Sequence, residues 1–191
     1  VYKNTKVDAQ MLKDADVDAV ILAIGSSPIT IKLEGMDKLQ HASAPEVLRH
    51  EVCPKGKVAV IGGGLVGLET ADTLATDGCD VTVLEMKDEI GSDLGSLRKI
   101  AVMMKLQQMQ VKMLPNSKVC KFTEEGIVLE DETLVPCNCA VFAVGFASND
   151  SHLLVEECEK RQIPCRVIGD AKSARRALDA IAEGFEAARA L

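Results

Sequence analysis

Three glycines and one glutamate have the types and the spacing to bind a dinucleotide. Gly62, Gly64 and Gly67 form the pattern GxGxxG, and Glu85 follows them at the end of the next apolar run. In such a pattern the first glycine turns the chain, the second lets the backbone approach a pyrophosphate, and the third lets a helix pack closely on a strand. The start of that helix faces the phosphates with free N–H groups and a positive dipole end.

Glu85 indicates which dinucleotide binds. Its carboxylate would accept hydrogen bonds from the hydroxyls of an adenosine ribose and would repel a 2′-phosphate, so the residue favours NAD over NADP. Lys87 weakens this preference, because an ammonium group two residues further on offers its charge to a phosphate. The pattern therefore predicts an NAD site.

The elements that must position these residues are a strand, a helix and a second strand. Residues 57–61 are mainly β-branched and small apolar residues, a segment of helical spacing follows the glycines, and residues 80–84 are a second strand-like run. This order is a βαβ unit. The other interpretation, a glycine turn that serves only the conformation of an α/β sheet, fits less well with an acid at the end of the second strand.

The composition argues against several classes of function. The chain has 191 residues, of which 47% are hydrophobic, and this is ample for a buried core. A net charge of -7, one Tyr and no Trp argue against a nucleic-acid partner, which needs a basic face and aromatic rings. No apolar run approaches the roughly 20 residues of a membrane helix. We therefore expect no membrane partner and a cytoplasmic location.

The seven cysteines predict neither disulfides nor a metal site. Their number is odd, they include no CxxC pair, and the closest two, Cys137 and Cys139, have no further ligands at suitable spacing. We expect reduced thiols that fill small apolar positions. The methionines of residues 103–113 are likewise expected to fill the core rather than to bind a soft metal.

Two further segments are expected beside the βαβ unit. Residues 93–110 predict an amphipathic helix with a buried apolar stripe, and residues 117–136 predict a small antiparallel meander. Residues 18–25 and 138–145 share one design, a polar residue, an apolar strand and an Ala-x-Gly end. This weak repeat suggests two related nucleotide-binding domains, the second inserted into the first. In the helix predicted over residues 93–110, the apolar stripe consists of Leu94, Leu97, Ile100, Ala101 and Met104.

Asp170 allows two interpretations. It follows a short strand, residues 166–168, and precedes a last helix with one apolar stripe. An acid in the first turn of a helix is favoured by the helix dipole. A carboxylate at the carboxyl edge of a sheet can instead receive a ligand hydroxyl. The stripe consists of Ala174, Ala177, Leu178, Ile181, Ala182, Phe185 and Ala188.

Four ordered motifs together resemble the pyridine nucleotide-disulfide oxidoreductase superfamily, flavoproteins with two dinucleotide-binding domains. The resemblance covers nearly the whole chain, and its last part is similar to the C-terminal part of NADH:flavin oxidoreductases with an Old Yellow Enzyme barrel, such as 2-enoate and 2,4-dienoyl-CoA reductases. The motifs are residues 23–28, 62–69, 143–146 and 167–171.

The resemblance implies a path for electrons. NADH gives hydride to FAD, and in the multidomain enzymes electrons pass through an iron–sulfur cluster to FMN, which reduces an activated carbon–carbon double bond. Hydride transfer belongs to the cofactors, so no catalytic side chain is expected here. The resemblance assigns the following residues to the NADH pyrophosphate: Gly62, Gly64, Leu65, Val66 and Gly67.

The resemblance also assigns a binding role to each of the remaining candidate residues. Glu85 would bind the adenosine ribose, and Glu69 would lie near the nicotinamide, although an acid favoured by the helix dipole explains Glu69 equally well. Gly145 would allow close approach of the cofactor. Gly169 and Asp170 would contact the ribityl chain and the pyrophosphate of FAD.

Departures from the family predict an excised fragment. No GxGxxG for FAD precedes residue 62, the barrel and the cluster cysteines are absent, and the sequence begins without Met. We expect an α/β fold in which a Rossmann-like three-layer NAD-binding domain with a small meander, residues 54–147, is inserted in an incomplete FAD domain, residues 1–53 and 148–191. FMN and the cluster would not be bound by this chain.

The fragment alone is expected to be inactive, with NADH and the missing parts of its parent chain as its partners. Two alternatives stay open at this point. One is a flavoenzyme of the NADH oxidase or ferredoxin reductase type, and the other is a non-catalytic module that senses NAD.

Overall fold

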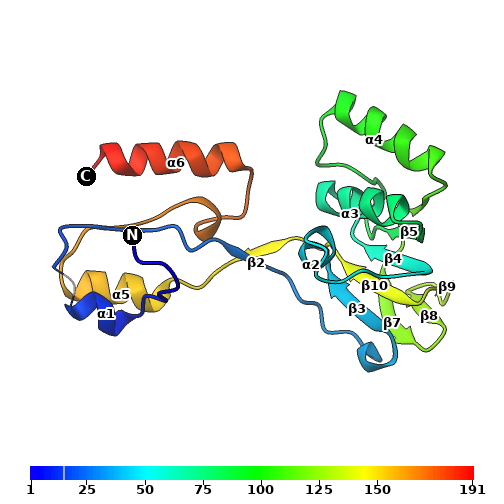
Figure 1. Ribbon diagram of the computed structural model, residues 1–191, viewed down its shortest axis with the longest axis horizontal. Helices are drawn as coiled ribbons and strands as arrows, with labels where there is room; N and C mark the ends of the chain where they lie inside the picture. Colours follow the sequence, from blue (N-terminus) through cyan, green and yellow to red (C-terminus); the bar gives the residue numbers. More distant parts are fainter. Residues whose placement is uncertain (15) are drawn as a thin grey trace. The chain divides into compact units, whose positions relative to one another are not determined.

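The computed structural model describes residues 1–14 and 16–191 (Figure 1). The chain forms two compact units. The larger unit is residues 28–145, and the smaller unit combines residues 1–27 with residues 146–191.

The larger unit is built on a parallel sheet of five strands in the order β3-β10-β4-β5-β6. Because neighbouring strands run in the same direction, their carboxyl ends meet at one edge, where ligands bind in open α/β sheets. The strands are β3 (Gln40–Ser43), β4 (Lys57–Ile61), β5 (Asp80–Leu84), β6 (Lys112–Leu114) and β10 (Cys139–Phe142).

Helices cover one face of this sheet and a meander covers the other, which makes three layers (Figure 1). Successive residues of β4 alternate between the two faces: Val58 and Val60 pack toward the helices, whereas Ala59 and Ile61 pack toward the meander. Burial on both faces explains why the strand is a continuous apolar run. The helices are α2 (Ala44–Leu48), α3 (Leu65–Thr76) and α4 (Ser96–Gln108).

The meander confirms the prediction for residues 117–136. Its strands β7 (Val119–Thr123), β8 (Gly126–Leu129) and β9 (Leu134–Pro136) pair antiparallel. Their apolar side chains pack against the sheet face opposite the helices. These side chains are Phe122, Ile127, Leu129 and Val135. The predicted βαβ unit is also confirmed, with α3 joining β4 to the parallel strand β5.

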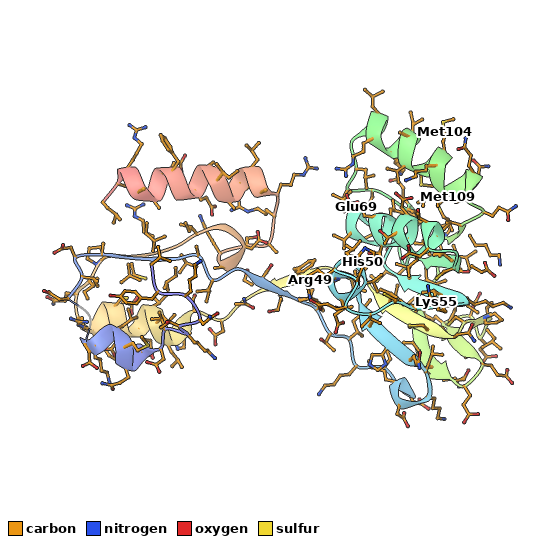
Figure 2. All side chains as sticks on the ribbon, viewed as in Figure 1. Arg49, His50, Lys55, Glu69, Met104 and Met109 are labelled. Carbon is orange, nitrogen blue, oxygen red and sulfur yellow. The ribbon has the colours of Figure 1, made fainter. Side chains whose placement is uncertain are left out.

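The predicted buried face of α4 is wrong. The helix forms where expected, but Leu97 is 85% exposed and Ile100 and Met104 are also exposed. The opposite face packs on the core through Val102, Met103, Leu106 and Met109. Figure 2 shows Met104 on the outer side of α4 and Met109 between α4 and α3. Both faces carry apolar residues at helical spacing, so periodicity did not identify the buried one.

The smaller unit contains two short parallel strands, β1 (Val20–Leu22) and β12 (Cys165–Val167), and an α1 (Ala9–Asp14) that lies on α5 (His152–Lys160). Strand β2 (Ser26–Pro28) pairs with β11 (Phe146–Ser148). The last helix is α6 (Ala177–Arg189).

The last helix differs from its prediction in two respects. It begins at Ala177, whereas the predicted stripe starts at Ala174. Its stripe is also not buried: Leu178 is 76% exposed, and Ile181 and Phe185 are exposed as well. A unit whose parallel sheet has two short strands provides little apolar surface on which to pack this helix. Among the described residues, no helix combines the length and the apolar character that crossing a membrane requires.

The observed division of the chain differs from the predicted limit at residue 53. Residues 28–53 belong to the larger unit, because β3 pairs with β10 and because Leu39 and Val47 lie in its core. Strand β3 is short, contains Gln, His and Ser, and lies at the edge of the sheet. Such a strand has little apolar pattern from which its place in a sheet can be predicted.

Candidate functional site

The glycine turn lies at the carboxyl end of β4, and its backbone explains why glycine is needed. Gly62 has a φ of +109°, and a Cβ at this position would overlap the carbonyl oxygen of Ala143. Gly67 lies in the first turns of α3, and a Cβ there would overlap the carbonyl oxygen of Gly62. The turn and the close packing of helix on strand are the two roles predicted for these glycines.

The N-cap residue of α3 provides no side-chain cap, and an acid from a distant part of the chain caps the helix instead. Gly64 is the N-cap residue and has no side chain with which to bind the first N–H groups. The N–H of Leu65 instead donates to both carboxylate oxygens of Asp93, at 3.1 and 2.9 Å. Asp93 has no role predicted from the sequence, because no spacing rule connects a loop acid to this helix.

The carboxylate of Glu85 is held beside the glycine turn. Its Oε2 accepts a hydrogen bond of 2.7 Å from the N–H of Gly63, and its Oε1 accepts one of 2.9 Å from the N–H of Lys87. Two backbone donors therefore fix the position of the carboxylate at the sheet edge. A ribose diol bound in front of it would find an oriented acceptor.

These residues line a cleft of about 580 Å³ within the larger unit. Ligand pockets of roughly 300–1,000 Å³ are typical of cofactor sites, so the volume suits a nucleotide. The cleft lies at the carboxyl ends of β4, β5 and β10. The predicted site residues that line it are Gly62, Gly64, Leu65, Val66, Glu85 and Gly145.

Loops that carry no recognisable motif complete the cleft. Ile31 and Leu33 come from the segment before β3, and Ser117 comes from the loop after β6. The N–H of Ser117 donates to the carbonyl of Glu85 at 2.7 Å, which holds that loop against the end of β5. The cleft carries charges of both signs, from Glu85, Asp93, Lys87 and Lys118.

Glu69 lies outside this cleft. It is on α3, where its Oε1 accepts a hydrogen bond of 2.7 Å from Arg98 of α4, and its side chain is about half exposed (Figure 2). Within the larger unit, the structure therefore groups Glu69 with the surface between α3 and α4, apart from the glycine turn and Glu85. Its predicted place near a nicotinamide stays a prediction.

Gly169 and Asp170 belong to the smaller unit, in a 3₁₀ turn between β12 and α6. Asp170 accepts hydrogen bonds from the Oγ of Ser26 at 3.1 Å and from the N–H of Arg175 at 3.3 Å. The first and the last of the four predicted motifs therefore meet at this carboxylate. Because α6 begins only at Ala177, Asp170 is not an acid of its first turn.

Glu183 of α6 organises the same turn. Its carboxylate binds Arg175, accepts a hydrogen bond of 2.7 Å from the N–H of Gly169, and lies 3.4 Å from the Nζ of Lys172. The hydrogen bond from Arg175, followed by that from Gly169, lowers the pKa of Glu183 to about 2. Gly169 has a φ of +59°, which favours glycine at this position.

Comparison with known proteins gives a family match over most of the chain. The family described as pyridine nucleotide-disulphide oxidoreductase matches residues 1–171. The chain is 36% identical to the bilirubin reductase of Mediterraneibacter gnavus, 34% to the cinnamate reductase of Clostridium sporogenes and 31% to the NADH oxidase of Thermoanaerobacter brockii. These alignments cover 96%, 97% and 98% of the chain.

The alignments cover only 29%, 28% and 30% of those relatives, so the chain spans less than a third of their length. Among solved structures, a 2-naphthoyl-CoA reductase in complex with 2-naphthoyl-CoA aligns with a TM-score of 0.84 at 24% identity. That alignment covers 96% of this chain and 28% of the other, and it shows a shared fold.

Proposed function

Because the chain belongs to the pyridine nucleotide-disulphide oxidoreductase family, we propose that its larger unit is the NADH-binding domain of a flavin-dependent oxidoreductase. The smaller unit is then part of the FAD-binding domain. One observation carries the proposal most directly: the Glu85 carboxylate hydrogen-bonds Gly63 of the glycine turn, and both Glu85 and the turn border the same cleft.

The residues of the cleft fit a dinucleotide. The turn at Gly62 and Gly64 brings backbone to the start of α3, where N–H groups and the helix dipole favour a pyrophosphate. Glu85 supplies an acceptor for the adenosine ribose and disfavours the 2′-phosphate of NADPH. Apolar side chains such as Ile31, Leu33 and Val144 line other parts of the cleft.

The chemistry of the parent enzyme belongs to its cofactors. When NADH and FAD are bound, they supply hydride transfer from one to the other, and the protein contributes position. In the smaller unit, Gly169 and Asp170 are the residues proposed to contact FAD, because the turn is held in place by Ser26, Arg175 and Glu183.

In the parent, electrons are proposed to pass onward through an iron–sulfur cluster and FMN to an activated carbon–carbon double bond. The support is the similarity to a cinnamate reductase and a bilirubin reductase. The similarity to an NADH oxidase favours a second candidate, in which the parent is a flavoenzyme of the NADH oxidase type. A cytoplasmic location is also proposed, because the odd number of cysteines and the lack of a CxxC pair in the sequence favour reduced thiols.

The test is a titration of the 191-residue chain with NADH, followed by nicotinamide fluorescence. We expect saturable binding that Glu85→Ala weakens by about tenfold or more, since the ribose loses charge-assisted hydrogen bonds. Asp88→Ala removes an exposed acid from the same loop and is the matched control, with binding unchanged. Equal binding by wild type and Glu85→Ala would contradict the ribose role.

A further inference from the structure

We propose that Asp93 sets the affinity of the dinucleotide site. In the ligand-free fold its carboxylate occupies the place of the pyrophosphate at the start of α3, and it must turn away when NADH binds. The inference rests on the proposed function of the cleft and adds a residue that neither the glycine pattern nor Glu85 identifies.

Asp93 caps a helix that has no cap of its own. The N-cap residue, Gly64, has no side chain, and both carboxylate oxygens of Asp93 accept from the N–H of Leu65. A Cβ on Gly64 would lie 3.1 Å from Asp93 Oδ2, so the carboxylate reaches the surface that the second glycine of the pattern leaves open. An acid at this point is favoured by the same dipole that would favour a phosphate.

A pyrophosphate and the Asp93 carboxylate compete for this place. Both are anions, both use the N–H groups of the first helical turn, and Asp93 is itself a lining residue of the cleft. A bound dinucleotide must therefore either displace the carboxylate or remain next to its charge. In each case the negative charge of Asp93 opposes binding, and its removal strengthens binding.

The backbone around Asp93 is anchored, so the side chain has to move rather than the loop. The N–H of Gly91 donates to the carbonyl of Gly63 at 2.7 Å, and Ile90 is buried. On the other side, Leu94 packs against the core of the larger unit. Rotation about the side-chain bonds of Asp93 would free the N–H of Leu65, and side-chain rotations are fast.

The experiment compares wild type with Asp93→Asn and Asp93→Ala in the full 191-residue chain. NADH binding is followed by nicotinamide fluorescence, and the Tm is measured without ligand. We expect both variants to bind NADH about tenfold more tightly, while their ligand-free Tm falls because the helix loses its acidic cap. Asp88→Asn, from the same exposed loop, is the control and should change neither quantity.

A second arm separates an effect on the phosphates from a general change in the fold. ADP-ribose and adenosine are each made to compete with NADH for wild type and for Asp93→Asn. The variant should bind ADP-ribose about tenfold more tightly and adenosine with unchanged affinity, because adenosine carries no phosphate to compete with the carboxylate.

The two proposals fail in different ways. If wild type binds NADH and the Asp93 variants bind it equally or more weakly, Asp93 is only a helix cap and this inference is overturned. If both ADP-ribose and adenosine bind more tightly, the effect is not on the phosphates, and the inference is again overturned. If neither wild type nor any variant binds NADH, the proposed function itself fails, and this inference fails with it.

Discussion

The N–H of Gly63 donates a hydrogen bond of 2.7 Å to the carboxylate of Glu85, 22 residues later in the chain. The bond joins the glycine turn after β4 to the end of β5. It therefore unites the two halves of the sequence pattern that predicts a dinucleotide site.

Gly63→Ala tests whether this bond matters. A Cβ at residue 63 would lie 3.0 Å from the Cβ of Glu85 and 3.2 Å from Ile90, so the carboxylate must shift. We expect NADH binding to weaken by about tenfold, with a loss of stability of about 1–3 kcal/mol from overpacking. Nicotinamide fluorescence and urea unfolding measure the two effects.

Gly95→Ala is the control for this substitution. Gly95 has a φ of -65°, and a Cβ there meets no atom within 4 Å among the described residues. This variant should bind NADH as wild type does. If Gly63→Ala behaves like Gly95→Ala, the contact between Glu85 and Gly63 has no part in binding.

The packing of α4 makes a prediction about stability. Leu106 is fully buried between α4 and the core, whereas Leu97 on the other face is 85% exposed. Leu106→Ala should lower the free energy of unfolding by about 2–5 kcal/mol, because it leaves a cavity. Leu97→Ala removes the same atoms from an exposed position and should change it by less than about 0.5 kcal/mol. Equal losses in urea unfolding would contradict the burial of Leu106 and the exposure of Leu97.

Glu183 makes a prediction about pH. Its pKa is lowered in the folded chain to about 2, first by Arg175 and then by the N–H of Gly169, from an ordinary value of 4.5. A lowered pKa means that ionised Glu183 stabilises the folded state above pH 4.5 and that this contribution disappears as the pH falls toward 2.

The measurement for Glu183 is thermal unfolding of wild type and Glu183→Gln across this range. Wild type should have the higher Tm at neutral pH, and the difference should shrink below pH 4.5 and be nearly gone close to pH 2. Glu186→Gln, on the same helix, is the control and should show no such change. A difference that is constant with pH would show that the charge of Glu183 does not stabilise the turn.

The sequence predicted those parts of the fold whose residue pattern lies within a short stretch of the chain. The glycines, the apolar run of β4 and the position of Glu85 depend on spacing within one βαβ unit, and the structure has that unit. The meander likewise follows from short apolar runs separated by turns.

What the sequence did not predict depends on contacts between distant segments. The buried face of α4 is chosen by α3 and the sheet, and the exposed stripe of α6 depends on how little surface the smaller unit has for covering it. Asp93 reaches Leu65 from 28 residues away through a loop with no periodic pattern. Neither the periodicity of the sequence nor a motif predicts such a contact.

The most direct test of the central claim, an NADH site in the larger unit with Glu85 at the ribose, is a parallel titration of the wild-type chain with NADH and NADPH. We expect NADH to bind about tenfold more tightly, because the Glu85 carboxylate accepts from a ribose diol and repels a 2′-phosphate. The Glu85→Ala variant should lose most of this difference. Tighter binding of NADPH than of NADH by wild type, or binding of neither, would contradict the claim.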